Sequence, residues 1–237
     1  MDRGEILQKI EEYKASFLLK GLVPITKYYD FSIEDTVAIN VVANELDSIP
    51  YRMLVIPEFV NEIICENKLV SGLTEKLIFN GDIKIYGGAF YYFDLLNSVT
   101  FKGNAYLDDS CFEMSNIDTV YFKGEKVYIG DKVFLCTVET TLKFYSSYVE
   151  IGGSECLAEN MVLDFSDAPL KSFSINKDAD ILGYDESFEI IVSDYNADYI
   201  TRTFIEANYL LEQLGQYTYR VMQVRDDDFI DEEYQYD

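Results

Sequence analysis

The apolar residues between positions 77 and 165 recur at a nearly fixed interval. Four rows of apolar side chains keep in step over successive units, with steps of 22 residues in three rows and alternating steps of 22 and 21 in the fourth. The rows are Ile83, Ala105, Val127 and Val149; Ile85, Leu107, Ile129 and Ile151; Phe90, Phe112, Phe134 and Cys156; and Phe79, Phe101, Phe122, Phe144 and Phe165. A fixed period in this range indicates a stacked solenoid, in which no single unit can bury its own apolar face.

Each unit contains two short stretches in which apolar and polar residues alternate, such as residues 99–101 and 105–107. This is the two-residue period of a half-buried strand. Gly81, Gly103 and Gly124 follow the first strand of their units and predict a turn there. After the second strand, a turn of small or acidic residues precedes the aromatic residue. An irregular or helical segment then returns the chain to the next unit.

This unit resembles the BspA-like class of bacterial leucine-rich repeats, which carry an apolar strand, a Val/Ile pair, a Gly-rich turn and an aromatic plug. Residues 129–134 match the plug segment, and residues 56–63 look like an earlier unit in which Lys68 takes the aromatic position. The likeness spans about residues 54 to 192. It implies a β-rich, leucine-rich-repeat-like, right-handed stack of short strands with helical caps. The chain departs from the family in lacking an export signal.

The flanking segments predict the two ends of the stack. Residues 4–19 are expected to form an amphipathic helix that caps the first rung, with a partner-binding or dimerising helix as the alternative. Its apolar positions are Ile6, Ile10, Tyr13 and Phe17. Residues 20–53 predict an atypical first rung with a strand at 36–42 and a turn at 44–50.

Beyond Phe165 the register weakens into irregular rungs that close at residues 188–192. A helix is then expected, with Gly215 as its stop, followed by a last strand at 217–224. The helical positions are Ile200, Phe204, Ala207, Leu211 and Leu214. The predicted organisation is an N-terminal helix with an atypical first rung (1–53), the solenoid (54–192), a helical C-terminal cap (193–225) and an acidic tail (226–237).

The charge of the chain indicates which partners it can bind. The net charge is −24, so the surface repels DNA, RNA and anionic membranes and attracts basic proteins. Apolar residues make up 49% of the chain, which excludes global disorder. The first residues lack a secretory signal pattern, and no apolar run approaches the roughly 18 residues of a membrane span. We therefore expect a soluble cytoplasmic protein, of a bacterium or of the host cell if the chain is phage-encoded.

Residues for catalysis are sparse, because the chain contains no histidine. This removes the usual general base and the commonest metal ligand. No phosphate-binding or dinucleotide-binding motif is present. The cysteines Cys65, Cys111, Cys136 and Cys156 show no CxxC spacing and are interpreted as buried free thiols, with a reactive thiol as the alternative. We expect no enzyme, no metal site and no cofactor.

Outward strand positions offer a possible binding surface rich in tyrosine and lysine. The candidates are Lys102, Tyr106, Tyr121, Lys123, Tyr128, Lys143 and Tyr145. Tyrosine is enriched in protein interfaces. The alternative interpretation is that long and aromatic side chains simply suit an exposed sheet.

The tail interleaves apolar anchors with carboxylates and contains no basic residue. Its candidate binding residues are Asp226, Asp227, Asp228, Phe229, Asp231, Glu232, Glu233 and Tyr234. A solvated, disordered tail and a segment that orders on binding are both compatible with this composition.

Taken together, the sequence predicts a non-enzymatic solenoid that binds a protein with a basic surface. A sharper version is an inhibitor that imitates nucleic acid on a nucleic-acid-binding protein, as phage anti-defence proteins such as anti-CRISPR proteins do. The alternative is a structural or assembly subunit of a phage particle or bacterial array.

Overall fold

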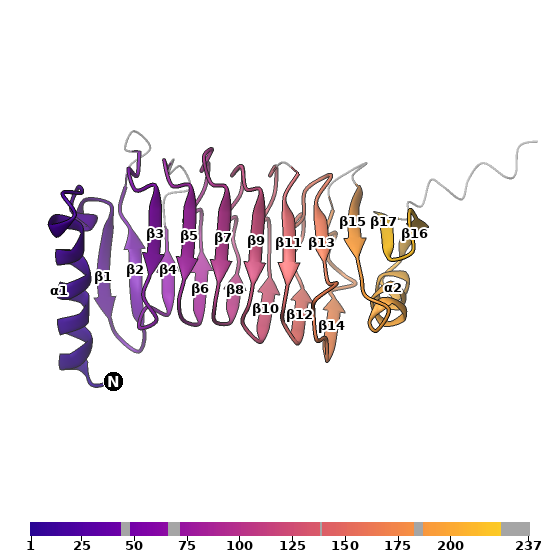
Figure 1. Cartoon of the computed structure of the whole chain (residues 1–237), viewed down its shortest axis with the longest axis horizontal. Helices are drawn as coiled ribbons and strands as arrows, with labels where there is room; N and C mark the ends of the chain where they lie inside the picture. Colours follow the sequence, from indigo (N-terminus) through magenta and orange to yellow (C-terminus); the bar gives the residue numbers. More distant parts are fainter. Residues whose placement is uncertain (44–47, 66–71, 138, 183–186, 224–237) are drawn as a thin grey trace, which may run out of the picture.

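The computed structural model describes residues 1–43, 48–65, 72–137, 139–182 and 187–223. Short strands stack along one axis into an elongated, β-rich solenoid with a helix at each end (Figure 1). The predicted fold class, a β-rich repeat solenoid, is therefore confirmed. No helix in the described ranges is long and apolar enough to cross a membrane.

Except at the two ends of the molecule, consecutive strands alternate between two sheets. The first sheet contains, in spatial order, β1 (Tyr29–Ile33), β2 (Val37–Val41), β4 (Glu62–Ile64), β6 (Ile83–Tyr86), β8 (Ala105–Leu107), β10 (Lys126–Ile129), β12 (Tyr148–Ile151) and β14 (Ser172–Ile175). The second contains β16 (Tyr209–Gln213), β17 (Thr218–Gln223), β15 (Ser187–Ile191), β13 (Val162–Asp164), β11 (Thr141–Phe144), β9 (Thr119–Phe122), β7 (Ser98–Phe101), β5 (Lys76–Phe79) and β3 (Met53–Ile56).

Residues that are one repeat apart in the sequence are paired on neighbouring strands of these sheets. Val127 pairs with Ala105 on one side and with Val149 on the other, and Phe101 pairs with Phe122. Neighbouring strands are parallel except for the pairs β1–β2, β15–β17 and β16–β17. Each unit is therefore one rung, and equivalent positions lie directly above one another.

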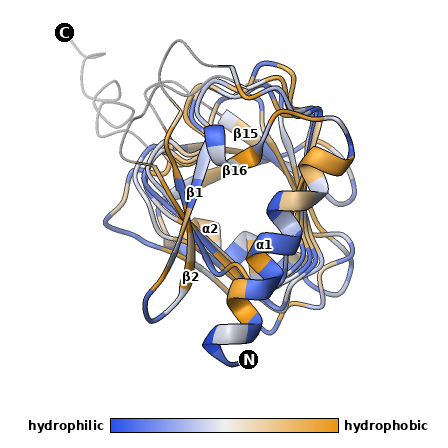
Figure 2. Cartoon of the chain, turned by 90° about the vertical axis from the view of Figure 1, so that its left-hand side faces the viewer, coloured by the Kyte–Doolittle hydropathy of each residue, from blue (hydrophilic) through white to orange (hydrophobic). Residues whose placement is uncertain are grey.

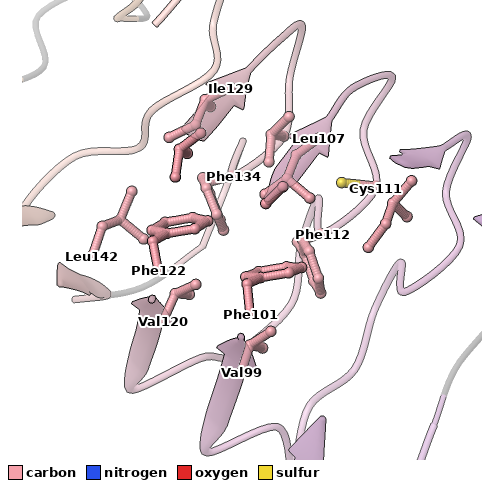
Figure 3. Packing of buried hydrophobic residues seen from close by; sticks show 14 of the residues in the cluster. Val99, Phe101, Leu107, Cys111, Phe112, Val120, Phe122, Ile129, Phe134 and Leu142 are labelled. Atoms are coloured by element: carbon pink, nitrogen blue, oxygen red, sulfur yellow. The ribbon is translucent and has the colours of Figure 1, made fainter. Parts of the chain in front are cut away.

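The core contains the four predicted rows, together with further buried residues such as Val99, Val120 and Leu142 (Figure 3). Three of the rows point inward from the two sheets, and the plug row comes from the segments that connect them. Rings of the phenylalanine row stack along the axis with centroid distances of 4.7 Å between Phe79 and Phe101 and 5.2 Å between Phe101 and Phe122. The plug row stacks in the same way, with Phe112 lying 5.3 Å from Phe90 and 5.9 Å from Phe134. Stacked rings of this kind bury a large apolar area.

The corner between the two strands of a rung is tight. Gly81, Gly103 and Gly124 stack there, and a Cβ atom on Gly103 or Gly124 would overlap the backbone of the glycine below it. Ser146 takes the next position and donates a hydrogen bond from Oγ to the carbonyl oxygen of Gly124, at 2.7 Å. The predicted glycine turns are thus positions where neighbouring backbones approach closely.

The helix predicted at residues 4–19 is confirmed as α1 (Arg3–Leu19), which lies across the N-terminal end of the stack (Figures 1 and 2). Asp2 and Glu5 form a capping box at its start. Phe17 is buried, with its ring 4.8 Å from that of Tyr51. A short 3-10 helix (Ile25–Lys27) follows. The strand predicted at 36–42 is confirmed as β2, whereas Lys68 and positions 44–47 of the predicted turn lie outside the described residues.

The C-terminal cap differs from the prediction. The helix α2 spans Ala197–Glu206, so the prediction that Leu211 and Leu214 continue it is wrong. Asn208 has a left-handed φ of 65°, which ends the helix. The chain then enters β16, which pairs antiparallel with β17. The predicted last strand is confirmed as β17, and the cap combines a helix with a β-hairpin.

Candidate functional site

Three lateral surfaces run along the solenoid. The first-sheet face consists of the outward side chains of β6, β8, β10, β12 and β14, and the second-sheet face of those of β5, β7, β9, β11 and β13 and of the residues directly after these strands. The return face consists of the described residues within 88–97, 109–118, 131–140 and 153–161, which lead from the first sheet to the second.

The structure divides the residues predicted to bind a partner between two of these surfaces. Tyr106 and Tyr128 lie on the first-sheet face. The second-sheet face carries Lys102, Tyr121, Lys123, Lys143 and Tyr145. The tail candidates, Asp226, Asp227, Asp228, Phe229, Asp231, Glu232, Glu233 and Tyr234, lie outside the described residues. The predicted residues therefore do not form one continuous site.

A groove of about 520 Å³ runs along the first-sheet face. Its walls are two outward rows that lie two residues apart on each strand, and its floor is formed by the strands between them. One row contains Asp82, Asn104, Lys126, Tyr148 and Ser172, and the other Lys84, Tyr106, Tyr128, Glu150 and Ser174. The groove crosses the strands, so its length follows the number of rungs.

The aromatic rings of this groove are already in contact with neighbours. The Tyr106 and Tyr128 rings stack at 4.4 Å with 10° between their planes, and the Tyr106 hydroxyl donates to Asp108 at 3.3 Å. Burial, together with the negative charge of Asp108, raises the pKa of Tyr106 to about 12. Nζ of Lys126 and of Lys171 lies over the Tyr148 ring, at 5.8 and 5.6 Å from its centroid. A ligand in the groove would thus meet ring edges and hydroxyl groups more than ring faces.

The second-sheet face is basic, although the chain as a whole is strongly acidic. Lys143 forms an ion pair with Asp164, with 3.2 Å between Nζ and Oδ2. Burial opposes ionisation of Asp164, but hydrogen bonds from Ser166 and the ion pair with Lys143 outweigh it and lower the pKa of the carboxyl group. Nζ of Lys123 lies 5.8 Å from the centroid of the Tyr121 ring. The face therefore presents cations beside aromatic rings.

The return face has a regular backbone even though it contains no strand. The amide of Tyr92 donates to the carbonyl of Glu113 at 3.2 Å, and the amide of Met114 donates to that of Leu135 at 2.8 Å. Tyr92, Met114 and Cys136, which are 22 residues apart, have left-handed φ values of 58°, 56° and 57°. This conformation is uncommon for residues other than glycine, and here the hydrogen bonds between rungs hold it in place. It forms a third ladder along the solenoid.

The side chains of the return face combine exposed apolar groups with carboxylates. Tyr92, Leu95 and Met114 are 43%, 47% and 40% exposed. The Tyr91 hydroxyl lies 2.8 Å from the sulfur of Met114, so side chains of neighbouring rungs are in contact on this face. The acidic residues of this face are Asp94, Asp109, Glu113, Asp118, Asp131, Glu139, Glu155 and Glu159. Its basic residue, Lys132, is neutralised by an ion pair with Glu155 at 3.2 Å.

Sequence reasoning did not select the residues of the return face. The signal was present: Tyr92, Met114 and Cys136 recur at the 22-residue period, and their segments are acidic. Their exposure could not be derived from alternation, because the return segments have neither the two-residue period of a strand nor the 3.6-residue period of a helix.

Three of the four cysteines are buried as interpreted, namely Cys65, Cys111 and Cys156. Cys136 is exposed, so its interpretation as a buried thiol is wrong; it occupies the exposed left-handed position of its rung. Burial raises the pKa of the Cys111 and Cys156 thiols, which disfavours the reactive thiolate there. Within the described ranges, no group of three or more His, Cys, Asp or Glu side chains is placed to hold a metal ion.

Comparison with known proteins gives no family, since no family model, no curated protein and no solved structure matches the chain. The likeness to BspA-like repeats accordingly stays a prediction from the repeat pattern.

Proposed function

We propose that this protein is a non-enzymatic scaffold that binds a partner protein with a basic surface through its return face. The observation that carries the proposal is the set of exposed Tyr92, Leu95 and Met114 side chains among the carboxylates of that face. Protein interfaces combine an apolar centre with a polar rim, and they are enriched in Tyr and Met. A methionine side chain can adapt its shape to the partner surface.

The charge density of the return face also supports the sharper form of the proposal, imitation of nucleic acid. Eight carboxylates lie on four rungs. One of them is paired with Lys132, and strands in a sheet are about 4.8 Å apart, so the remaining seven amount to about one negative charge per 2.7 Å. Double-stranded DNA carries about one per 1.7 Å. A protein site shaped for a phosphate backbone would therefore meet a comparable density of charge here.

The test compares two pairs of substitutions that remove equal charge. Asp94→Asn with Glu113→Gln neutralises the rim of the return face, and Glu125→Gln with Glu150→Gln removes the same charge elsewhere. Immobilised wild-type chain recovers basic proteins from a bacterial lysate at low salt, and each is then rebound to both variants. We expect the return-face pair to weaken binding and the control pair to leave it nearly unchanged, because electrostatic attraction depends on complementary patches.

The apolar centre is tested separately by Tyr92→Ala with Met114→Ala. A central hot spot is worth about 2 kcal/mol or more, which corresponds to at least about a 30-fold loss of affinity. If this variant binds normally while Tyr121→Ala or Tyr128→Ala does not, the interface lies on a sheet face and the assignment to the return face is wrong.

An assembly subunit is the second candidate function. It is favoured by β16, which is an edge strand of the second sheet and carries Leu210 at 50% exposure. An exposed edge strand can pair with another chain. The mass of the protein in solution distinguishes this function from the first.

A further inference from the structure

The second-sheet face has a charge opposite to that of the rest of the molecule. Between β5 and β13 its charged side chains are Lys76, Lys102, Lys123, Lys143 and Asp164. Asp164 neutralises only Lys143. Net positive charge therefore remains on this face of a chain with a net charge of −24.

Lys102 and Lys123 place like charges on adjacent rungs, which destabilises the sheet. The Phe101–Phe122 pair is the last of the β7–β9 ladder, and the amides of Lys102 and Lys123 continue that ladder by donating to Phe79 and Phe101. The two ammonium groups thus extend from adjacent rungs, where like charges destabilise a sheet. Both residues are exposed, and neither forms an ion pair with any other described residue. The carboxylates of Glu12 and Glu58 line a pocket with Lys102 but form no ion pair with it, so Lys102 and Lys123 lack a paired counter-charge among the described residues.

We propose that the acidic tail of the same chain, residues 226–237, docks on the second-sheet face and supplies this counter-charge. The tail contains carboxylates and no basic residue. Its apolar residues Phe229, Tyr234 and Tyr236 match a face that presents Tyr121 and Tyr145 beside its lysines. The proposed occupant and its site are therefore complementary in both charge and aromatic character.

The tail leaves the fold on the same sheet and is long enough to reach the lysines. It follows β17, which is separated from β9 by β15, β13 and β11 and from β7 by one more strand. At about 4.8 Å per strand, β9 and β7 are about 19 and 24 Å away from β17 across the sheet. β17 ends beside the first residue of β15, whereas Lys102 and Lys123 follow the last residues of β7 and β9, so the tail must also run about five residues, or about 17 Å, along the strands. The two lysines are therefore about 25 to 30 Å from the end of β17. Twelve extended residues span up to about 40 Å.

Because the tail belongs to the same chain as the second-sheet face, weak ion pairs are sufficient for it to dock there. Each exposed ion pair contributes little and is screened by salt. A segment tethered to its own site by a short linker, however, has an effective concentration in the millimolar range. Docking in the same molecule is therefore favoured over docking of a separate acidic peptide.

The experiment is zero-length carbodiimide crosslinking of the full chain at low ionic strength, with peptide mass spectrometry. We expect amide links from tail carboxylates to Lys102 and Lys123, and their loss in about 0.5 M salt, where screening is strong. Lys84 and Lys126 are matched controls, because they are exposed strand lysines on the first-sheet face. Links spread evenly over all four lysines would overturn the proposal.

Two further measurements separate the other outcomes. A mixture of isotope-labelled and unlabelled chains distinguishes the source of the tail: links between differently labelled chains would show that a second copy supplies it, and the proposal would be wrong. A full-length variant with Asn and Gln in place of the tail acids is compared by the acetylation rate of its lysines. We expect Lys102 and Lys123 to react about two- to fivefold faster, the change that a few exposed ion pairs can produce, and Lys84 and Lys126 to keep their rates. Equal rates for all four would refute docking. Neither measurement depends on the partner proposed for the return face.

Discussion

At the scale of single residues, Phe112 shows how one side chain serves several rungs. Its ring stacks between Phe90 and Phe134 and meets the edge of Phe101 at 6.4 Å. A core residue of this kind contributes through the apolar area it buries and through the contacts its neighbours would lose without it.

We predict that Phe112→Ala lowers the free energy of unfolding by about 3–5 kcal/mol, as removal of a large buried aromatic side chain generally does. The effect spreads along the stack, because the cavity adjoins both neighbouring rungs. Urea denaturation followed by far-UV circular dichroism measures it. Tyr92→Ala is the matched control, since its ring is partly exposed and its removal leaves no buried cavity. An unfolding midpoint close to that of the wild type in Phe112→Ala would contradict the placement of the row.

Residue-level prediction from the sequence succeeds where strand alternation operates. Ile83 and Ile85 could be placed inside and Lys84 outside because successive side chains of a strand point to opposite faces. The left-handed backbone of Met114 could not be predicted, since it depends on a hydrogen bond to the next rung and not on its own preference.

At the scale of elements, the two helices end the sheets in a similar way. Tyr199 of α2 accepts a hydrogen bond from the amide of Phe173 at 3.0 Å and donates one to its carbonyl at 3.1 Å. These groups belong to β14, the last strand of the first sheet. At the other end, Tyr13 of α1 donates to the carbonyl of Val55 on β3, the edge strand of the second sheet, at 2.9 Å. A tyrosine hydroxyl thus occupies a position that the next strand would fill.

We predict that Tyr199→Phe destabilises the protein by about 1–2 kcal/mol, because it leaves two backbone groups of Phe173 without their partner. The loss is local, so hydrogen exchange of the Phe173 amide accelerates more than that of amides in the central rungs. Tyr195→Phe is the control, since the Tyr195 side chain is 85% exposed. Equal exchange rates in wild type and Tyr199→Phe would show that the hydroxyl does not cap the strand.

The error in the C-terminal cap has a physical origin at this scale. Ile200, Phe204, Ala207, Leu211 and Leu214 have helical spacing, but Leu211 pairs with Val221 in a hairpin. A local apolar period cannot reveal a pairing with a strand that comes later in the sequence, and tertiary contacts override local propensity.

At the scale of the whole molecule, the architecture could be predicted because the period itself describes it. The sequence alone could not predict how charged side chains are distributed among the lateral surfaces of the solenoid. Lys123 and Tyr128 are close in sequence and both point outward, yet they lie on different sheets and belong to surfaces of different charge. Assigning a binding surface required the path of the chain between the sheets.

We predict that the protein is a monomer at micromolar concentration. Two of the edge strands have helix tyrosines on their backbone groups, and the net charge of −24 opposes self-association. Light scattering coupled to size-exclusion chromatography measures the mass. A large homo-oligomer that persists at high dilution would favour the assembly subunit over the binding scaffold.

The stacked glycine corners and phenylalanine rows do not limit the number of rungs in the solenoid. A rung touches only the rungs beside it, so copying one 22-residue unit within the array would add a strand to each sheet and a segment to the return face without changing either cap. Point substitutions at outward positions would then alter the new unit independently of its core. A lineage could therefore lengthen its binding surface by duplicating units within the coding sequence, and diversify each unit afterwards.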